Sequence, residues 1–278
     1  MRAGFPTLRD RLQQLPGLHC VDGVLVQRSL ADDPFEQQYL QVRRKEGRVY
    51  TDAQVRSLPR PGGKLGASLE WQVRALSSAL LVQHLRAQVG EGAIAELGCG
   101  NGWLSQLLAQ SLQRDVCGID VNRTELTQAA RVFGHDQRLS FIAADIQTLA
   151  LPRDLFDVIV VPACIQYFAD PAALVVRLLA QLRDGGELHI LDSPLYADAQ
   201  AANASAARSL RYFTKLGVPA LAAHYHQHTY ASFDRFVVQR LFDPRRPGAR
   251  LRRMLRMKQP HFPWLCLRRQ DNLDALRS

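Results

Sequence analysis

Two patterns of apolar residues alternate through the middle of the chain. Short continuous apolar runs are typical of strands buried on both faces of a sheet, and apolar residues that recur every three or four positions are typical of helices packed on one. The runs that predict strands are 93–96, 116–120, 139–143, 156–161 and 187–191. Helical spacing precedes or separates them at 69–89, 103–112, 123–132 and 171–182. Because strands alternate with helices, we expect an α/β fold with a doubly wound, mostly parallel sheet and right-handed crossovers.

Residues 1–66 show a weaker pattern. Alternation around the Asp-Gly pair at 22–23 suits a short hairpin, and the spacing at 35–44 predicts a helix. The proline and glycine run at 59–63 marks a loop or a domain boundary. We therefore expect a mainly helical N-terminal extension or cap over 1–66 and one main domain over 67–278.

The pattern changes again after the fifth predicted strand. An alanine-rich segment at 201–216 and the segment 232–241 both have helical spacing, and Ser232 suits the position before a helix. We expect residues 251–257 and 261–267 to pair as an antiparallel hairpin at the C-terminal end of the sheet.

Composition narrows the class of protein. The chain has 278 residues, of which 47% are hydrophobic and 22% charged, as is typical of a globular chain that buries its own core. No apolar run approaches the roughly 18 residues that span a bilayer, and residues 1–10 lack a signal-peptide core. Five scattered cysteines without a Cys-x-x-Cys pair favour reduced thiols over disulfides or a zinc site. We expect a soluble, cytoplasmic protein with no membrane span.

The net charge of +9 is concentrated near the C-terminus. Residues 245–258 include seven Lys or Arg residues and no acid. Such a run is either a solvated basic face or a docking site for an anionic substrate or surface.

The sharpest signal is a glycine-rich turn between the strand that ends at Glu96 and the helix that begins at Trp103. Its glycines are Gly98, Gly100 and Gly102. Glycine tolerates positive φ and lets a ligand lie against the main chain, and the first amides of the next helix point at that ligand. The nicotinamide fingerprint G-x-G-x-x-G needs a third glycine at position 103, where a tryptophan stands. The spacing therefore disfavours a nicotinamide dinucleotide.

Acids close two further strands. Asp120 ends the second predicted strand, and Asp145 follows the third. An isolated aspartate at a strand end is usually a helix cap or a solvated turn residue. Here both lie at the sheet edge where doubly wound folds bind ligands, and an acid after the second strand can hold ribose hydroxyls.

These residues carry a family resemblance. The run 96–102 resembles motif I of the class I S-adenosyl-L-methionine-dependent methyltransferases, although Glu96 stands where aspartate is frequent. Residues 119–120, 144–146 and 156–161 are similar to later motifs of the same family, and the likeness covers about 70–195. The resemblance implies a Rossmann-like, seven-stranded sheet with an antiparallel C-terminal hairpin, S-adenosylmethionine as cofactor, and no metal.

The resemblance also implies the contacts of the cofactor. Gly98 and Gly100 would lie against the methionine part, Asp120 would hold the ribose, and Asp145 with the amide of Ile146 would bind the adenine. An acid at Glu96 suits the methionine ammonium, and an arginine suits its carboxylate. Arg74 is a candidate for the second role, although a surface pair with Glu70 explains it equally well. The complete set of predicted cofactor-contact residues is Glu96, Gly98, Cys99, Gly100, Asp120, Val121, Asp145, Ile146, Pro162 and Arg74.

The acceptor side is less defined. The loops after the fourth and fifth strands should border the acceptor pocket, and no catalytic residue is assigned. Candidates for a general base are Tyr167, Asp192, Tyr196 and His226. Aromatic residues of the N-terminal part that could cover the pocket are Phe35, Tyr39, Tyr50 and Trp71.

Two other chemistries are disfavoured for this region. A metal site at His226 and His228 would want carboxylate partners, and Asp234 is the only acid nearby. Cys164 as a nucleophile lacks an identified base.

We expect in-line methyl transfer to a small-molecule acceptor. One alternative is a nucleic-acid methyltransferase that uses the basic run at 245–258. Against it, no Asn-Pro-Pro-Tyr-like loop follows the fourth strand, where Pro-Ala-Cys-Ile stands at 162–165. Another alternative is a noncatalytic protein that binds S-adenosylmethionine as a scaffold. The acceptor, the atom methylated and the oligomeric state stay open.

Overall fold

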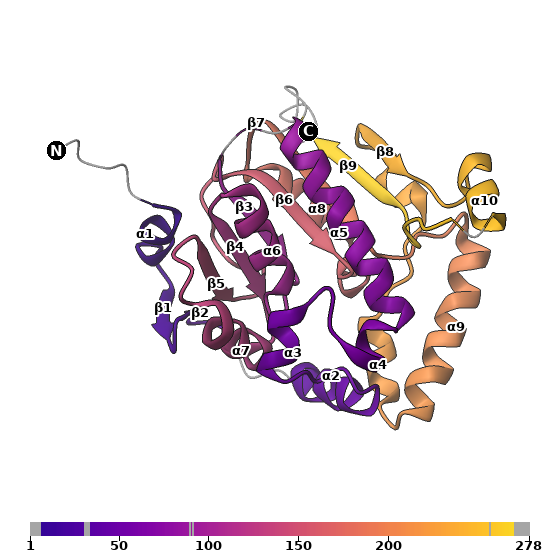
Figure 1. Cartoon of the computed structure of the whole chain (residues 1–278), viewed down its shortest axis with the longest axis horizontal. Helices are drawn as coiled ribbons and strands as arrows, with labels where there is room; N and C mark the ends of the chain where they lie inside the picture. The colour runs from indigo at the N-terminus through magenta and orange to yellow at the C-terminus, as the bar shows by residue number, and fades with distance from the viewer. Residues whose placement is uncertain (1–6, 31–33, 89, 91, 256, 270–278) are drawn as a thin grey trace.

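A nine-stranded sheet forms the centre of the described part of this computed structural model, which covers residues 7–30, 34–88, 90, 92–255 and 257–269 (Figure 1). The strand order is β1-β2-β5-β4-β3-β6-β7-β9-β8. The six strands from β2 to β7 run parallel, and the pairs β1–β2, β7–β9 and β9–β8 are antiparallel. The strands are β1 (Leu18–Val21), β2 (Val24–Gln27), β3 (Ile94–Leu97), β4 (Val116–Asp120), β5 (Leu139–Ala143), β6 (Phe156–Pro162), β7 (Leu182–Leu191), β8 (Val238–Phe242) and β9 (Trp264–Arg268).

Helices cover both faces of the sheet, as the alternating pattern predicts. One hydrophobic cluster packs α5, α6 and α7 on one face, and a second packs α1 and α8 on the other (Figure 1). The helices are α1 (Leu8–Gln13), α2 (Pro34–Lys45), α3 (Asp52–Ser57), α4 (Gly63–Gly66), α5 (Leu69–Gln88), α6 (Trp103–Leu112), α7 (Arg123–Phe133), α8 (Pro171–Leu179), α9 (Ala199–Lys215) and α10 (Pro247–Met254), with short 3-10 helices η1 (Ile165–Tyr167), η2 (Pro219–His224) and η3 (Tyr230–Phe233). The predicted α/β class is confirmed.

The predicted hairpin near the N-terminus is present, but it belongs to the sheet. Strand β2 is buried along its length and pairs in parallel with β5, through Leu25 and Ile142 among others. The sheet therefore has nine strands in the described residues instead of the expected seven, while most of the regular structure before residue 67 is helical, as expected. Sequence pattern reveals a hairpin but not its pairing with a strand more than a hundred residues away.

Two C-terminal elements are corrected. Residues 238–242, predicted as the end of a helix, form β8 and pair with β9. Residues 251–254, predicted as a strand, lie in α10, which begins at Pro247. Proline suits a first helical position, because its missing N–H has no partner there anyway. An antiparallel strand pair does end the sheet, but different residues form its first strand.

The segment from α2 to α4 lies across the carboxyl ends of the central strands (Figure 1). Asp52 forms an ion pair of 2.8 Å with Arg131 of α7, and Arg48 forms one of 2.5 Å with Glu70 of α5. These contacts hold the segment over the edge where the glycine turn lies. The division at residue 66 stays a prediction.

None of the helices in the described ranges combines the length and the apolar character needed to cross a membrane.

Candidate active site

The glycine turn has the backbone that its sequence predicts. Gly98, Gly100 and Gly102 have φ values of +75°, +51° and +75°. A Cβ on Gly98 would lie 2.7 Å from the side chain of Cys164, and one on Gly102 would lie 2.8 Å from Phe141. The turn therefore needs glycine for its dihedral angles and for close packing.

This turn forms one wall of a cavity at the carboxyl ends of the parallel strands. All ten of the predicted cofactor-contact residues line that cavity. The structure thus brings together residues that are up to 88 positions apart in sequence, from Arg74 to Pro162. Their individual contacts with a cofactor stay predictions.

The two strand-end aspartates accept hydrogen bonds from backbone amides of the turns at the strand ends. Asp120 accepts hydrogen bonds from the amides of Gly100 (2.8 Å) and Asn122 (2.9 Å). Burial raises the pKa of Asp120. Asp145 accepts from the amide of Gln147 at 2.9 Å. Asn122 is the N-cap of α7, and no helix of the described part begins between β5 and β6, so the two aspartates stabilise turns on the cavity wall and are not helix caps.

Glu96 is the most deeply buried acid of the cavity wall, with 2% of its surface exposed. It accepts a hydrogen bond of 2.5 Å from the hydroxyl of Ser105. Burial raises its pKa to about 8. A cation beside Glu96 would favour the ionised form and lower this pKa.

Arg74 forms the predicted surface pair with Glu70, and its contact with the cofactor carboxylate stays a prediction. It pairs with Glu70 at 3.1 Å, one helical turn away, and its guanidinium lies over the ring of Trp71. It also lines the cavity.

Several cavity residues were not predicted from sequence. Glu125 lies near Gly100, and burial raises its pKa to about 7. It occupies the first turn of α7, where an acid looks like an ordinary complement to the helix dipole. Arg43 and Arg48 also line the cavity, from the segment that covers it. No local signal assigns these three residues, because only the packing of α2 and α7 brings them to the strand ends.

The predicted aromatic cover is largely present. Tyr39, Tyr50 and Trp71 line the cavity. Tyr50 accepts a hydrogen bond of 3.1 Å from the indole of Trp71, which packs edge-on against Trp103. The side chain of Phe35 lies outside the described residues.

A second cavity adjoins the first. Ala163, Tyr167 and Asp192 line both cavities. Ala163 and Asp192 follow β6 and β7 directly and have φ values of +53° and +55°, in the left-handed region. Non-glycine residues rarely adopt this conformation, and they concentrate at functional sites when they do. The aromatic residues that line only the second cavity are Tyr212, Phe213, Tyr225 and Phe262.

Two of the four general-base candidates lie at this junction. Asp192 accepts a hydrogen bond of 2.7 Å from Ser77, and burial raises its pKa. Burial also raises the pKa of Tyr167, which packs edge-on against Tyr39 and Tyr225.

The other two candidates line neither cavity. The hydroxyl of Tyr196 lies 2.6 Å from Ser205, and the amide of His226 donates to the carbonyl of Gln166 at 2.7 Å. Both are held in the packing behind the second cavity. Cys164 is also no nucleophile, since its thiol donates to the carbonyl of Leu97 and burial raises its pKa well above the usual range.

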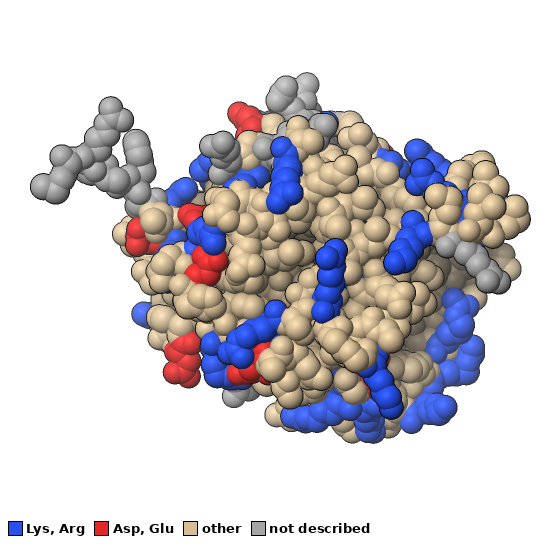
Figure 2. Space-filling model, in the orientation of Figure 1, with Lys and Arg blue, Asp and Glu red and all other residues tan. Residues whose placement is uncertain are grey.

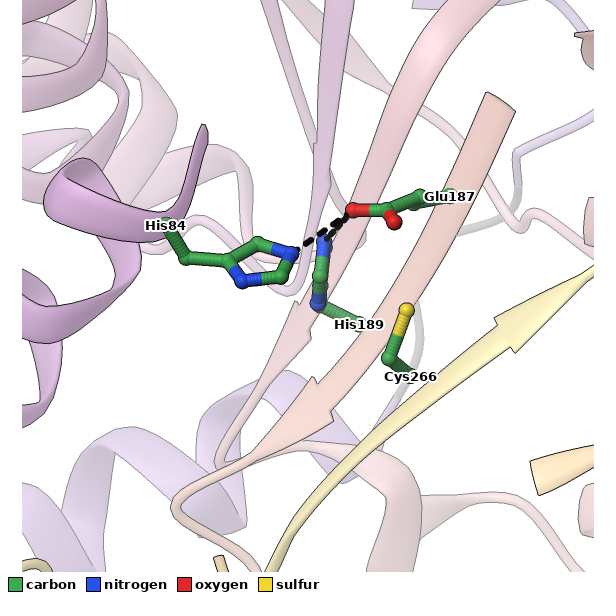
Figure 3. A group of neighbouring side chains, drawn as sticks. All are labelled: His84, Glu187, His189 and Cys266. Carbon is green, nitrogen blue, oxygen red and sulfur yellow. Dashed lines mark hydrogen bonds and ion pairs between the residues drawn. The ribbon is translucent and has the colours of Figure 1, made fainter. Parts of the chain in front are cut away.

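Figure 3 shows a separate cluster of polar side chains between α5, β7 and β9. It contains His84, Glu187, His189 and Cys266, whose potential ligand atoms all lie within 4.8 Å of one another. Such a set is chemically suited to zinc. The predicted pair His226 and His228 lies elsewhere.

The polar atoms of this cluster form hydrogen bonds with one another and with neighbouring side chains. The Nε2 atoms of His84 and His189 lie 2.9 Å and 3.1 Å from Oε2 of Glu187, and Arg268 donates to Oε1. The indole of Trp264 donates to Nδ1 of His189 at 3.1 Å. Because an indole nitrogen only donates, Nδ1 is an acceptor and Nε2 of His189 carries the proton. That Nε2 has no lone pair for a metal, so the cluster is a hydrogen-bond network centred on a carboxylate.

The charge of Glu187 follows from this network. Burial alone would raise its pKa, but hydrogen bonds from His189, His84 and Arg268 hold the pKa well below its usual range. Burial lowers the pKa of His189. The network therefore joins an ionised glutamate and an arginine with a neutral buried imidazole.

Comparisons with known proteins agree with this architecture. Residues 94–186 match the family model described as a methyltransferase domain. A malonyl-[acyl-carrier protein] O-methyltransferase from Paenibacillus sp. is 30% identical over 118 residues, which are 41% of this chain and 43% of that protein. A 2-methyl-6-phytyl-1,4-hydroquinone methyltransferase from Synechocystis sp. is 27% identical over 99 residues, which are 36% of this chain and 31% of that protein. The chain thus spans less than half the length of these curated relatives.

Solved structures share the fold at low sequence identity. The YcgJ protein from Bacillus subtilis superposes with a TM-score of 0.51 at 14% identity, over 70% of this chain and 98% of that one. The plantazolicin methyltransferase BpumL, solved with S-adenosylhomocysteine, gives a TM-score of 0.51 at 16% identity, over 84% of this chain and all of that one.

The fold and the family match define a class of protein. Residues 94–186 match a methyltransferase domain, and the chain shares the Rossmann-like fold of class I methyltransferases. The resemblance stated from the sequence is confirmed.

Proposed function

We propose that this protein transfers a methyl group from S-adenosylmethionine to a small-molecule acceptor by in-line displacement. The observation that carries the proposal is the placement of the ten predicted contact residues around one cavity, which adjoins a second at Tyr167 and Asp192. Two adjoining cavities at the carboxyl ends of parallel strands suit a donor and an acceptor held in line.

The residues of the first cavity fit this cofactor. Gly98 and Gly100 present bare backbone to the cavity, and a side chain on either would crowd the turn. Asp120 offers carboxylate oxygens to ribose hydroxyls, and buried Glu96 favours a cationic partner such as the methionine ammonium. Asp145 and the amide of Ile146 would hold the adenine. When bound, the cofactor supplies a methyl group already activated by its sulfonium charge.

The residues at the junction would act on the acceptor. A raised pKa makes Asp192 a stronger base than an exposed aspartate, so it would accept a proton from an acceptor that loses one. Tyr167 stays protonated at neutral pH and would donate a hydrogen bond that orients the acceptor. Tyr196 and His226 have no role in this proposal, since they line neither cavity.

A small molecule suits the second cavity better than a nucleic acid does. Its walls combine aromatic rings with Arg43, Arg48 and Arg74, which suits an apolar or aromatic molecule that bears a polar or acidic group. The relatives are named for acceptors that differ from one another. The choice of acceptor therefore rests on the cavity walls of this chain.

Calorimetry with S-adenosylhomocysteine tests the cofactor assignment. We expect the wild-type protein to bind it and Asp120→Ala to weaken binding by about thirtyfold or more, because hydrogen bonds to a charged group contribute about 1.5–3 kcal/mol each. Asp120→Asn separates loss of charge from loss of the bond to the Gly100 amide. Asp184→Ala is the matched control, since that side chain is 92% exposed and lines neither cavity. Absence of binding by folded wild-type protein would disprove the proposal.

A further inference from the structure

Helix α10 and the residues after it carry an unusual set of exposed apolar side chains. Leu251, Met254, Leu255 and Met257 are 52%, 76%, 61% and 53% exposed. The first three follow the spacing i, i+3, i+4, which places them along one ridge of the helix. Figure 1 shows α10 at the periphery of the molecule, away from the helices that pack on the sheet. Four large apolar side chains exposed within seven residues indicate a surface that meets something apolar.

Basic residues flank the ridge. Arg250 and Arg252 are exposed and lie about 100° from Leu251 around the helix, one on each side. No acid occurs anywhere in 245–258. In Figure 2, Lys and Arg are spread over the side of the molecule that bears α9 and α10, whereas most of the visible Asp and Glu lie on the opposite side.

A second copy of the chain would complement only the apolar ridge of this surface, and a nucleic acid would complement only its arginines. Pairing two α10 helices would bury the ridges but would bring arginines against arginines. Phosphates of a nucleic acid would neutralise the arginines, but the segment has no aromatic side chain on which a base could stack.

A protein partner is also a poor match. Specific protein interfaces bury at least about 1,000 Å², and one helix of eight residues supplies only a fraction of that area. Reversible adsorption on a lipid surface has no such threshold, because each apolar side chain and each arginine adds its own small contribution.

We propose that helix α10, with Leu255 directly after it, docks on an anionic lipid surface, with the ridge of Leu251, Met254 and Leu255 in the boundary between headgroups and acyl chains. Arg250 and Arg252 reach the headgroups on either side. The helix lies in the plane of the interface, in keeping with the absence of a spanning helix in the described ranges.

The position of α10 connects this surface with the second cavity. Leu69, which is 70% exposed, and His261 line both the second cavity and a groove whose other wall includes Arg250 and Met257. Docking would therefore bring the mouth of the second cavity close to the lipid surface. If the proposed methyl transfer is correct, an apolar acceptor could pass between membrane and cavity, but the docking itself does not depend on that reaction.

Vesicle flotation with the full chain tests the docking. We expect the protein to float with phosphatidylcholine vesicles that contain 30% phosphatidylglycerol, to stay unbound with pure phosphatidylcholine, and to release as salt rises. The double variant Arg250→Gln/Arg252→Gln should bind about thirtyfold more weakly, since each basic residue near an anionic surface contributes about 1 kcal/mol. The triple variant Leu251→Ser/Met254→Ser/Leu255→Ser should lose binding even at low salt.

Two matched controls separate this segment from general charge and hydrophobicity. Arg56→Gln/Arg153→Gln removes the same charge elsewhere, and Val237→Ser removes an apolar side chain that is 61% exposed. Both should bind as wild type does, and all variants should keep the wild-type melting temperature. The docking is disproved if the anionic vesicles bind no protein, if the α10 variants float like wild type, or if the α10 variants instead abolish a dimer or binding to an acidic protein.

Discussion

The buried carboxyl of Glu96 should make the cofactor-free protein less stable as pH rises, and one substitution should remove this dependence. Its pKa is raised by burial to about 8 from an ordinary value of 4.5. The folded state therefore holds a proton on Glu96 that the unfolded state releases across this range. The stabilisation is complete below about pH 4.5 and is lost as pH rises to about 8. Glu96→Gln keeps the shape and the bond from Ser105 but cannot ionise.

The size of the effect follows from the pKa difference. Each pH unit between the two pKa values lowers the stability of the wild-type protein by about 1.4 kcal/mol relative to a variant that does not ionise. Between pH 6 and pH 8 the advantage of Glu96→Gln should therefore grow by about 2 kcal/mol, allowing for relaxation of the buried site.

Urea unfolding at pH 6, 7 and 8 without cofactor measures this difference. Other groups that titrate in the same window, such as Glu125, are present in both proteins and cancel in the comparison. Asp184→Asn, a change at a side chain that is 92% exposed, should show no such trend. Saturating S-adenosylhomocysteine should remove most of the trend, because an ammonium beside Glu96 keeps it ionised. A stability difference between wild type and Glu96→Gln that stays constant from pH 6 to pH 8 would refute the reasoning.

Two further predictions concern packing. Gly102→Ala should destabilise the protein by about 2–4 kcal/mol, because the residue has positive φ and an added Cβ would lie 2.8 Å from Phe141. Gly185→Ala should cost only the conformational part, about 1–2 kcal/mol, because Gly185 has a φ of +77° but open space around it; equal losses in thermal unfolding would contradict the packing argument. Glu187→Gln should lower the free energy of unfolding by about 2 kcal/mol, since it leaves the partly exposed Arg268 without its ion pair. Neither equimolar zinc nor a chelator should change the melting temperature of the wild-type protein. Stabilisation by zinc would show that the hydrogen bond from Trp264 does not fix the proton on Nε2 of His189.

Local sequence was sufficient for the central strands and the site they carry. The apolar runs at β3, β4, β5 and β6 have the continuous character that burial on both faces requires, so their type and approximate bounds follow from the local sequence pattern. The ligand edge follows as well, since the ends of parallel strands must meet there. For that reason Glu96, Asp120 and Asp145 could be assigned to one cavity before the fold was known.

Local sequence was insufficient where pairing partners are distant. Val238 to Phe242 has the spacing of a helix and the alternation of a strand, and only β9 decides between them. The covering segment is a similar case, because Arg43 and Tyr39 reach the cavity through ion pairs and hydrogen bonds that α2 to α4 make with α5 and α7. The separation of Tyr196 and His226 from Tyr167 and Asp192 also depends on how the loops after β6 and β7 fold back.

The sequence by itself determined the class of domain and the cavity edge, because the glycine turn and each strand-end acid are local features that involve only a few neighbouring residues. The tertiary structure decided which side chains share the two cavities, which polar cluster is a hydrogen-bond network, and which apolar residues of α10 stay exposed. Those outcomes depend on contacts between segments far apart in the chain, and the free energy of such contacts is not a property of any one segment.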